Sequence, residues 1–358
     1  MSKFGRSMFP PPSTDADSSI RSTDSDAALA KLSAVQKQYL SDPYIQYFVP
    51  RAHLQPARPP LINIGTYVRT AAIDDLVNQW LSLSHDEGKQ CQIVSLGAGS
   101  DTRYWRIAAG PQKDALSTYI EIDFPEITSK KAMAIRKSKQ LSAVLGNPAD
   151  VKVSGGGTAL HASKYHLLPA DLRLSPQETL GPLLTQDSEP LLSPSLPTLL
   201  LFECVLVYMS PAASSSLLKW FLLYFSQSGN NGFLGTIVYE MFGLQDSFGR
   251  VMVDNLKARN VSLPGAEPYS AVGTLPTRFT GIGYTAARAL TLRDIRLQYV
   301  SRVELNRIST LEFLDEVEEL DLVLNHYAIT WGLWHPGTET KALWGMWGLK
   351  TQLSPGNT

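Results

Sequence analysis

The stretch that most constrains the fold is residues 92–102, which reads QIVSLGAGSDT. It begins with apolar residues typical of a buried strand, and Gly97 and Gly99 then follow one residue apart. The pattern next turns helical, with Asp101 or Thr102 as the N-cap. Glycine has no Cβ, and a helix N-terminus offers free N–H groups, so such a turn can approach a ligand closely. The stretch predicts a strand, a tight turn and a helix start beside a binding site.

The glycine turn is incomplete as a phosphate-binding fingerprint. The full G-x-G-x-x-G pattern requires a third glycine, and Thr102 stands at that position. This disfavours a pyrophosphate ligand and favours a smaller nucleoside ligand that carries a carboxylate. On the glycines alone, an ordinary strand-to-helix turn is an equally good interpretation.

Length and composition limit the classes of protein. The 358 residues suit one large α/β domain with insertions or two small domains, and 44% hydrophobic residues allow a sizeable core. The net charge of -1 shows no basic excess for nucleic-acid binding. Cys91 and Cys204 lie beside apolar runs and predict buried free thiols. With no membrane-spanning run and no signal sequence, we expect a cytoplasmic protein without a membrane or nucleic-acid partner.

The chain divides by composition into a disordered start and one folded domain. Residues 1–26 are rich in Ser, Asp, Pro and Thr, which predicts disorder. The domain spans 27–358 and begins with a helical part, 27–90, in which the proline-rich residues 50–60 form an extended connector. Arg69 lies near the start of the next amphipathic helix. The apolar face of this helix consists of Ile73, Leu76, Val77, Trp80 and Leu81.

The region 91–244 alternates strand and helix patterns and forms the predicted cofactor-binding core. The strands expected in the chain are 93–96, 118–123, 165–168, 199–202, 233–239 and 326–331. Basic residues after Pro125 and apolar residues after Pro211 indicate helices between them. Residues 175–197 look like an insertion. The alternation predicts an α/β fold with an open, mostly parallel sheet.

The last third of the chain is expected to cover this sheet. Residues 245–300 mix helical and Gly/Pro-rich segments and are interpreted as an inserted, substrate-side region that does not extend the sheet. Residues 301–335 hold the last helix and strand. Capping-box patterns stand at 291–294 and 309–312, and the second is expected to open the last helix.

Acidic residues end three of the expected strands. In open α/β sheets, ligands bind at the carboxyl ends of the strands. Asp123 is at a suitable distance from the glycines to hold ribose hydroxyls, and Asp171 could accept from an adenine amino group. Glu203 ends a further strand. Each carboxylate alone is more often a cap or a loop residue, but together with the glycines they indicate a nucleoside site.

Other kinds of catalytic or metal site are not evident in the sequence. The six histidines are scattered, the two cysteines lie far apart, and no nucleophile-elbow pattern is present. His161 and His166 lie five residues apart, and we interpret them as surface or structural residues. We therefore expect no metal ion and no catalytic dyad or triad.

Several motifs in this order resemble the leucine carboxyl methyltransferase family. They are DPYI at 42–45, LGAGxDT at 96–102, ExDFP at 121–125, ADLR at 170–173, ECVLVYM at 203–209 and SxxEFLDE at 309–316. The resemblance runs from about residue 31 to about residue 331. It implies a class I, Rossmann-like methyltransferase fold with S-adenosylmethionine as cofactor. It also implies a protein C-terminal leucine carboxyl O-methyltransferase that acts on the C-terminal tail of type 2A protein phosphatase catalytic subunits.

The resemblance also implies roles for individual residues. The cofactor contacts would be Lys31, Arg69, Gly97, Gly99, Asp123, Asp171, Leu172 and Glu203. Arg69 would hold the methionine carboxylate and Tyr208 would lie near the transferring methyl group, so these two would be the catalytic residues. A peptide α-carboxyl is already ionised at pH 7, so the nucleophile needs no general base. Alignment of the reacting atoms and exclusion of water would then supply the catalysis.

Two alternative functions share the same fold. A sister class of methyltransferases acts on a hypermodified guanosine of transfer RNA and carries a C-terminal propeller, but this chain ends at Thr358 without a blade repeat. A non-catalytic protein could bind the phosphatase tail, although the intact glycine and acidic positions argue against it. We expect a monomer.

Overall fold

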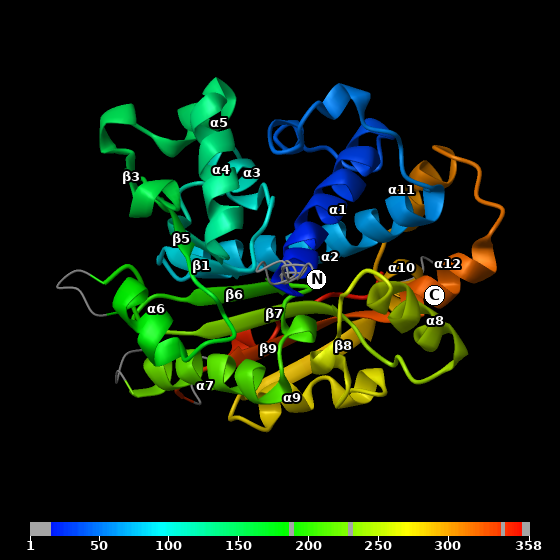
Figure 1. Ribbon diagram of the computed structural model, residues 1–358. Helices are drawn as coiled ribbons and strands as arrows, with labels where there is room; N and C mark the ends of the chain where they lie inside the picture. Colours follow the sequence, from blue (N-terminus) through cyan, green and yellow to red (C-terminus); the bar gives the residue numbers. More distant parts are fainter. Residues whose placement is uncertain (1–15, 186–189, 228–231, 338–340, 353–358) are drawn as a thin grey trace, which may run out of the picture.

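The computed structural model describes residues 16–185, 190–227, 232–337 and 341–352. A single twisted sheet with helices on both faces forms the centre of the molecule (Figure 1). Its strands are β1 (Cys91–Leu96), β2 (Leu116–Asp123), β3 (Lys152–Ser154), β4 (Ala159–His161), β5 (Tyr165–Pro169), β6 (Thr198–Glu203), β7 (Leu234–Met241), β8 (Ala286–Thr291) and β9 (Tyr327–Trp334). The predicted α/β fold is confirmed.

The order of strands across the sheet is β3-β4-β5-β2-β1-β6-β7-β9-β8. Strands β5, β2, β1, β6 and β7 are parallel neighbours, which confirms the mostly parallel sheet. Strand β9 runs antiparallel between β7 and β8, and β3 and β4 add a short antiparallel extension at the other edge. The carboxyl ends of the parallel strands therefore meet along one side, where ligands bind in such sheets.

The helices cover both faces of the sheet (Figure 1). They are α1 (Ala16–Gln36), α2 (Pro60–Asp86), α3 (Arg103–Ala108), α4 (Pro125–Lys137), α5 (Lys139–Ser142), α6 (Pro176–Leu184), α7 (Pro211–Gln227), α8 (Ser247–Lys257), α9 (Thr277–Thr280), α10 (Leu292–Gln298), α11 (Arg302–Ser309), α12 (Val317–Asn325) and α13 (Lys341–Trp344). Short 3-10 turns are η1 (Ile45–Tyr47), η2 (Ala52–Leu54), η3 (Ala143–Leu145), η4 (Pro148–Asp150), η5 (Gly155–Gly157), η6 (Leu206–Tyr208), η7 (Pro264–Ala266) and η8 (Val272–Thr274). None of the helices in the described ranges is long and apolar enough to cross a membrane.

Each face of the sheet has its own hydrophobic core. Along the central strand, Ile93 packs into the core beneath α2, α3 and α4, and the next residue, Val94, packs into the core beneath α6 and α7. This alternation follows from the two-residue period of a strand. Both faces of β1 are fully buried, and its two polar side chains, Gln92 and Ser95, are buried along with the apolar ones.

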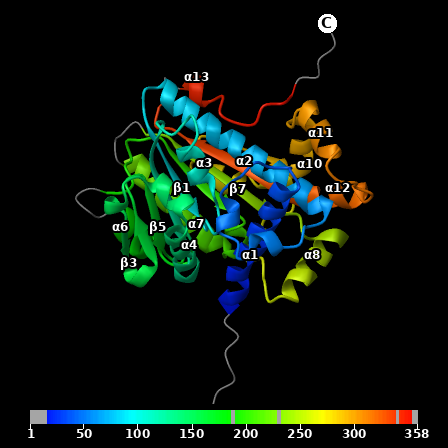
Figure 2. The same ribbon diagram turned by 90° about the horizontal axis from the view of Figure 1, so that it is seen from above.

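The N-terminal helix corrects the predicted boundary of the domain. Helix α1 begins at Ala16, so the disorder predicted for residues 16–26 is wrong, and residues 1–15 lie outside the described residues. The sequence of the first turns is polar and has no apolar stripe. Contacts with the rest of the chain hold this segment, including an ion pair of 3.0 Å between Asp24 and Lys130. From above, α1 is seen to pack on α2 (Figure 2).

Helix α2 is longer than the sequence predicted. It begins with Pro60 at its first position, inside the stretch 50–60 that was expected to be an extended connector. Proline suits that position because its missing N–H would have no partner there. Arg69 therefore lies in the middle of a long helix, on a rigid element, and not near a helix start.

Three expectations for the second half of the chain need revision. Strand β8 extends the sheet, although residues 245–300 were expected only to cover it. Its alanine-rich sequence has a weak strand preference, and it is a strand here because it pairs with β9. The capping box at 309–312 opens no helix, since Ser309 ends α11 and α12 begins at Val317. The stretch 175–197 contains α6, and residues 186–189 lie outside the described part.

The other capping box is confirmed. Thr291 precedes α10, and its hydroxyl accepts the N–H of Asp294 at 3.0 Å.

Candidate functional site

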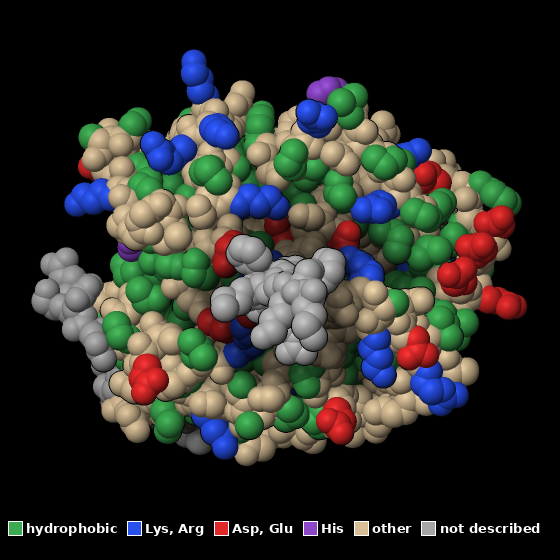
Figure 3. All heavy atoms as spheres, in the orientation of Figure 1, with side chains coloured by type: hydrophobic (Ala, Val, Ile, Leu, Met, Phe, Trp, Pro, Cys, Tyr) green, Lys and Arg blue, Asp and Glu red, His purple; other side chains and the backbone are tan. Residues whose placement is uncertain are grey.

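A cavity of about 330 Å³ opens at the carboxyl ends of the parallel strands. Its volume lies in the range of small-molecule sites. Figure 3 shows acidic and basic side chains gathered around the centre of this face. Every site residue predicted from the sequence lines the cavity, namely Lys31, Arg69, Gly97, Gly99, Asp123, Asp171, Leu172, Glu203 and Tyr208. The structure thus brings all of them together, while their individual roles stay predictions.

The glycine turn after β1 forms the floor of the cavity. Gly97 has φ +66°, and a Cβ there would lie 2.4 Å from Cγ2 of Val205. Its N–H donates to the carbonyl of Ile122 at 2.7 Å, which ties the turn to β2. Gly99 has φ +48°, and its N–H donates to Oδ2 of Asp123 at 2.7 Å. Both glycines are therefore required by backbone conformation and close contact.

Asp123 lies at the end of β2 and faces the glycine turn. Its second oxygen, Oδ1, accepts the N–H of Phe124 at 2.7 Å. Burial raises the pKa of Asp123 to about 6, and the nearby Asp24 adds to the shift, although the two backbone N–H groups oppose it. Each carboxylate oxygen can accept further hydrogen bonds, so hydroxyl donors in the cavity would stabilise the charged form.

Asp171 and Leu172 follow β5 and form the next wall. The carboxylate of Asp171 accepts from Nη2 of Arg173 at 2.6 Å, and the same guanidinium contacts Asp17 of α1 at 2.6 and 2.8 Å. Burial works against ionisation, but Arg173 still holds the pKa of Asp171 below its usual value. Leu172 is buried and offers an apolar surface. This wall can present a carboxylate and an apolar contact to the edge of a base.

Glu203 ends β6 and joins two arginines. Its carboxylate lies 3.1 Å from Nε of Arg69 and 3.0 Å from Nη2 of Arg103. The guanidinium of Arg69 also lies 5.1 Å from the ring centre of Tyr239, a cation–π distance. Arg69 is thus held from two sides, with its planar group at the cavity wall.

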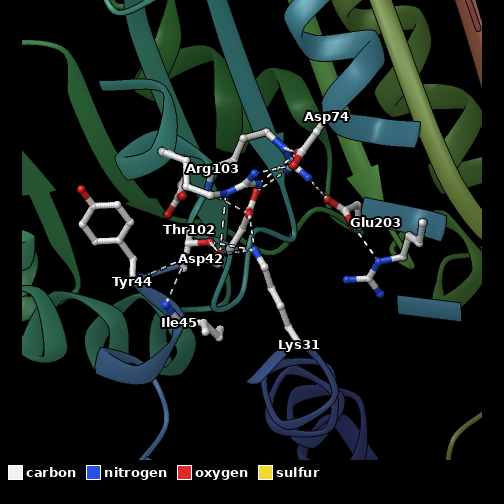
Figure 4. A network of polar contacts seen from close by, with 12 residues as sticks. Lys31, Asp42, Tyr44, Ile45, Asp74, Thr102, Arg103 and Glu203 are labelled. Carbon is white, nitrogen blue, oxygen red and sulfur yellow. Dashed lines mark hydrogen bonds and ion pairs between the residues drawn. The ribbon is translucent and has the colours of Figure 1, made fainter. Parts of the chain in front are cut away.

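A network of buried charges supports the glycine turn from behind (Figure 4). Lys31 of α1 places Nζ 2.9 Å from Asp42 and donates to the hydroxyl of Thr102 at 2.7 Å. Burial lowers the pKa of Lys31, and Asp42 opposes this shift. Lys31 therefore fixes the turn through Thr102, in addition to lining the cavity.

Arg103 is the centre of this network. It is the first residue of α3 and is only 3% exposed. Its guanidinium contacts Asp74 of α2 at 2.9 Å and Asp101 at 2.5 Å, in addition to Glu203 (Figure 4). One arginine thereby links α2, the glycine turn and the end of β6.

Tyr208 lies on the other side of the cavity, in η6. It packs against an apolar group that includes Met241, Leu256 and Tyr327. Burial raises the pKa of Tyr208 well above its usual value, so its hydroxyl stays a neutral donor near pH 7. Arg259 follows α8 on this side and pairs with Asp26 of α1.

Sequence reasoning missed several residues that line the cavity. They are Thr23, Asp24, Asp26, Arg103 and Arg259. Eight positions of α1 line the cavity, namely Ile20, Arg21, Thr23, Asp24, Asp26, Ala27, Ala28 and Lys31. Because most of them are polar, hydrophobic periodicity could not reveal this face.

Comparisons with known proteins find similarity to one family over most of the chain. The family model for leucine carboxyl methyltransferases matches residues 19–222. Leucine carboxyl methyltransferase 1 of Cryptococcus neoformans is 44% identical over 353 residues, covering 90% of this chain and 95% of that protein. The protein of the same name from Emericella nidulans is 37% identical, with 93% and 89% covered, and that from Bos taurus is 34% identical, with 90% and 91% covered.

Proposed function

Because the chain belongs to the leucine carboxyl methyltransferase family, we propose that it transfers a methyl group from S-adenosylmethionine to a C-terminal leucine carboxylate. The acceptor proposed is the tail of the catalytic subunit of type 2A protein phosphatases. The observation that supports this most is the meeting of all nine predicted residues at one cavity. The chain is a methyltransferase by family, and the identity of the acceptor is the proposed step.

The strand-end side of the cavity suits the cofactor. Asp123 would accept from ribose hydroxyls, and Asp171 with Leu172 would contact the adenine. Arg69 would hold the methionine carboxylate, for which its planar pair of donors is suited. When bound, the cofactor supplies an activated methyl group.

The opposite side of the cavity suits the acceptor. Met241, Leu256 and Tyr208 offer an apolar wall for a leucine side chain. Arg259 is the cation on this side, and its side chain is 52% exposed, so it can meet an incoming carboxylate. The acceptor carboxylate is ionised at pH 7 and needs no base, which fits the neutral hydroxyl of Tyr208 beside it.

Catalysis would rest on positioning. Arg69 on the rigid helix α2 and Tyr208 in η6 approach the cavity from separate elements, so they can hold donor and acceptor in line. Pre-alignment of this kind supplies roughly 7–11 kcal/mol at best. Arg259 must steer the carboxylate without binding the ground state more tightly than the transition state.

A labelled-methyl transfer assay tests the proposal. The protein is incubated with labelled S-adenosylmethionine and phosphatase catalytic subunit, either intact or lacking its last residue. We expect label only in the intact subunit. Equal labelling of both forms would overturn the assignment, and so would label in transfer RNA but not in the subunit when transfer RNA is added to a parallel incubation. A folded protein that does not bind S-adenosylmethionine in a titration would be a non-catalytic relative.

A further inference from the structure

The segment between α11 and α12 presents an aromatic side chain to solvent. Phe313 is 85% exposed, more than any other large hydrophobic side chain in the described residues. Its neighbour Glu312 is anchored, because Oε2 accepts from Nδ2 of Asn63 at 2.7 Å and Oε1 lies 3.3 Å from Nζ of Lys37. The backbone that carries Phe313 is therefore fixed to α2 and to the residue after α1.

Acidic residues follow Phe313 closely in the sequence. Asp315, Glu316, Glu318 and Glu319 are exposed, and no ion pair with a basic group is formed by these four within the structure as described. Val317 and Leu322 are 51% and 44% exposed on the same short stretch. Figure 3 shows acidic side chains gathered over the region of α12, with hydrophobic side chains beside them. We call these seven residues, Phe313 included, the Phe313 surface.

The segment that carries the Phe313 surface is anchored to two parts of the chain that also reach the cavity. Asn63, which anchors it, is six residues before the cavity-lining Arg69 on α2, and six residues of helix span about 9 Å. Lys37 likewise follows the cavity-lining Lys31 by six residues. The segment that carries the surface is thus connected through Glu312 to α2, which lines the cavity, and to the residue that follows the cavity-lining helix α1.

We propose that the Phe313 surface docks the folded body of the methyl-accepting protein while that protein's chain end enters the cavity. This inference rests on the proposed function. The complementary chemistry is an apolar pocket for Phe313 bordered by Lys or Arg side chains. Aromatic side chains are enriched in protein–protein interfaces, and complementary charge across an interface speeds association and selects the partner.

The charge of the surface argues against other occupants. In a symmetric pair of copies, each acidic surface would face its own equivalent, and like charges across an interface disfavour association. Nucleic acid and anionic membranes carry the same sign of charge as this surface. A basic protein surface is the partner class that remains.

Binding measurements with two variants test this docking. The partner is phosphatase catalytic subunit lacking its last residue, so that methyl transfer does not interfere. We expect Phe313→Ala to weaken binding about tenfold or more. We expect the double variant Glu316→Lys with Glu319→Lys to associate more slowly than the wild type. The difference in association rate should shrink at about 0.5 M salt, because salt screens the charges.

Matched controls come from the opposite helical layer. Leu223 of α7 is 52% exposed and Glu178 of α6 is exposed, so Leu223→Ala and Glu178→Lys change similar surface elsewhere. Both controls should bind the subunit like the wild type. All variants should bind S-adenosylhomocysteine with unchanged affinity, because the Phe313 surface is outside the cavity.

The outcomes separate the two proposals. A wild type that does not bind the truncated subunit refutes the docking surface, whereas the acceptor assignment is tested separately by the labelled-methyl assay on the intact subunit. A wild type that binds, together with an Phe313→Ala variant that binds equally well, refutes the docking surface alone. Self-association of the wild type that Phe313→Ala abolishes, measured by sedimentation, would assign the surface to a second copy and overturn the inference.

Discussion

The raised pKa of Asp123 predicts that cofactor binding depends on pH. Burial, with a contribution from Asp24, raises this pKa from 3.8 to about 6. The difference of about two units corresponds to about 3 kcal/mol against ionisation in the free protein. Since the folded pKa exceeds the unfolded one, this carboxyl stabilises the free protein least above about pH 6 and most below about pH 4.

Hydroxyl donors from a bound ribose would reverse this preference. They stabilise the charged carboxylate and lower its pKa, so binding would release a proton below about pH 6. We expect the affinity for S-adenosylhomocysteine to rise up to about tenfold per pH unit between about pH 4 and 6. Above about pH 6.5 the contribution of Asp123 should be constant.

Isothermal titration from pH 5 to pH 8 in two buffers of different ionisation enthalpy measures both affinity and proton release. The control is Asp123→Asn, which should remove the pH dependence. It should also weaken binding about tenfold at pH 7, since a hydrogen bond to a charged group contributes about 1.5–3 kcal/mol. If the affinity of a folded Asp123→Asn variant changes with pH as that of the wild type does, another group is responsible for the pH dependence. Unchanged affinity would remove Asp123 from the site.

Three further substitutions test the site and its support. Arg69→Lys should lose most methyl-transfer activity with little change in melting temperature, because lysine lacks the planar pair of donors. A large loss of stability with normal cofactor affinity would show instead that Arg69 has a structural role. Arg103→Met should lower the free energy of unfolding by about 3–5 kcal/mol in denaturant titrations, since Asp74, Asp101 and Glu203 each lose one of their cationic partners, and a loss under about 1 kcal/mol would contradict this. Gly97→Ala should destabilise more than Gly88→Ala, because both have φ +66° but only at Gly97 would the Cβ meet another residue, Val205. Equal losses of stability in the two variants would mean that backbone strain, and not the contact with Val205, determines the cost.

The parts of the fold and site that the sequence predicts depend on short-range patterns. The glycine turn and Asp123 stand out because a buried strand, a turn and a carboxylate follow one another within a few residues. Parallel strands bring their ends to the same side, so the positions of Asp171 and Glu203 follow once the alternation of elements is recognised.

The parts that sequence analysis missed depend on tertiary contacts. Helix α1 begins with polar turns that are held by partners such as Arg173 and Lys130, more than 100 residues away in the chain. Strand β8 forms because β9 offers an unpaired edge, which local preference does not encode. Arg103 belongs to the site because it meets Glu203, and neither residue carries a signal of that contact in the sequence.

The central claim is that the acceptor is a main-chain leucine carboxylate, and mass spectrometry of the reacted phosphatase catalytic subunit tests it most directly. We predict one added methyl group on the C-terminal residue, removed by mild alkali with release of methanol, as expected of a methyl ester. A methyl group that survives mild alkali, or that maps to an internal side chain, would contradict the claim.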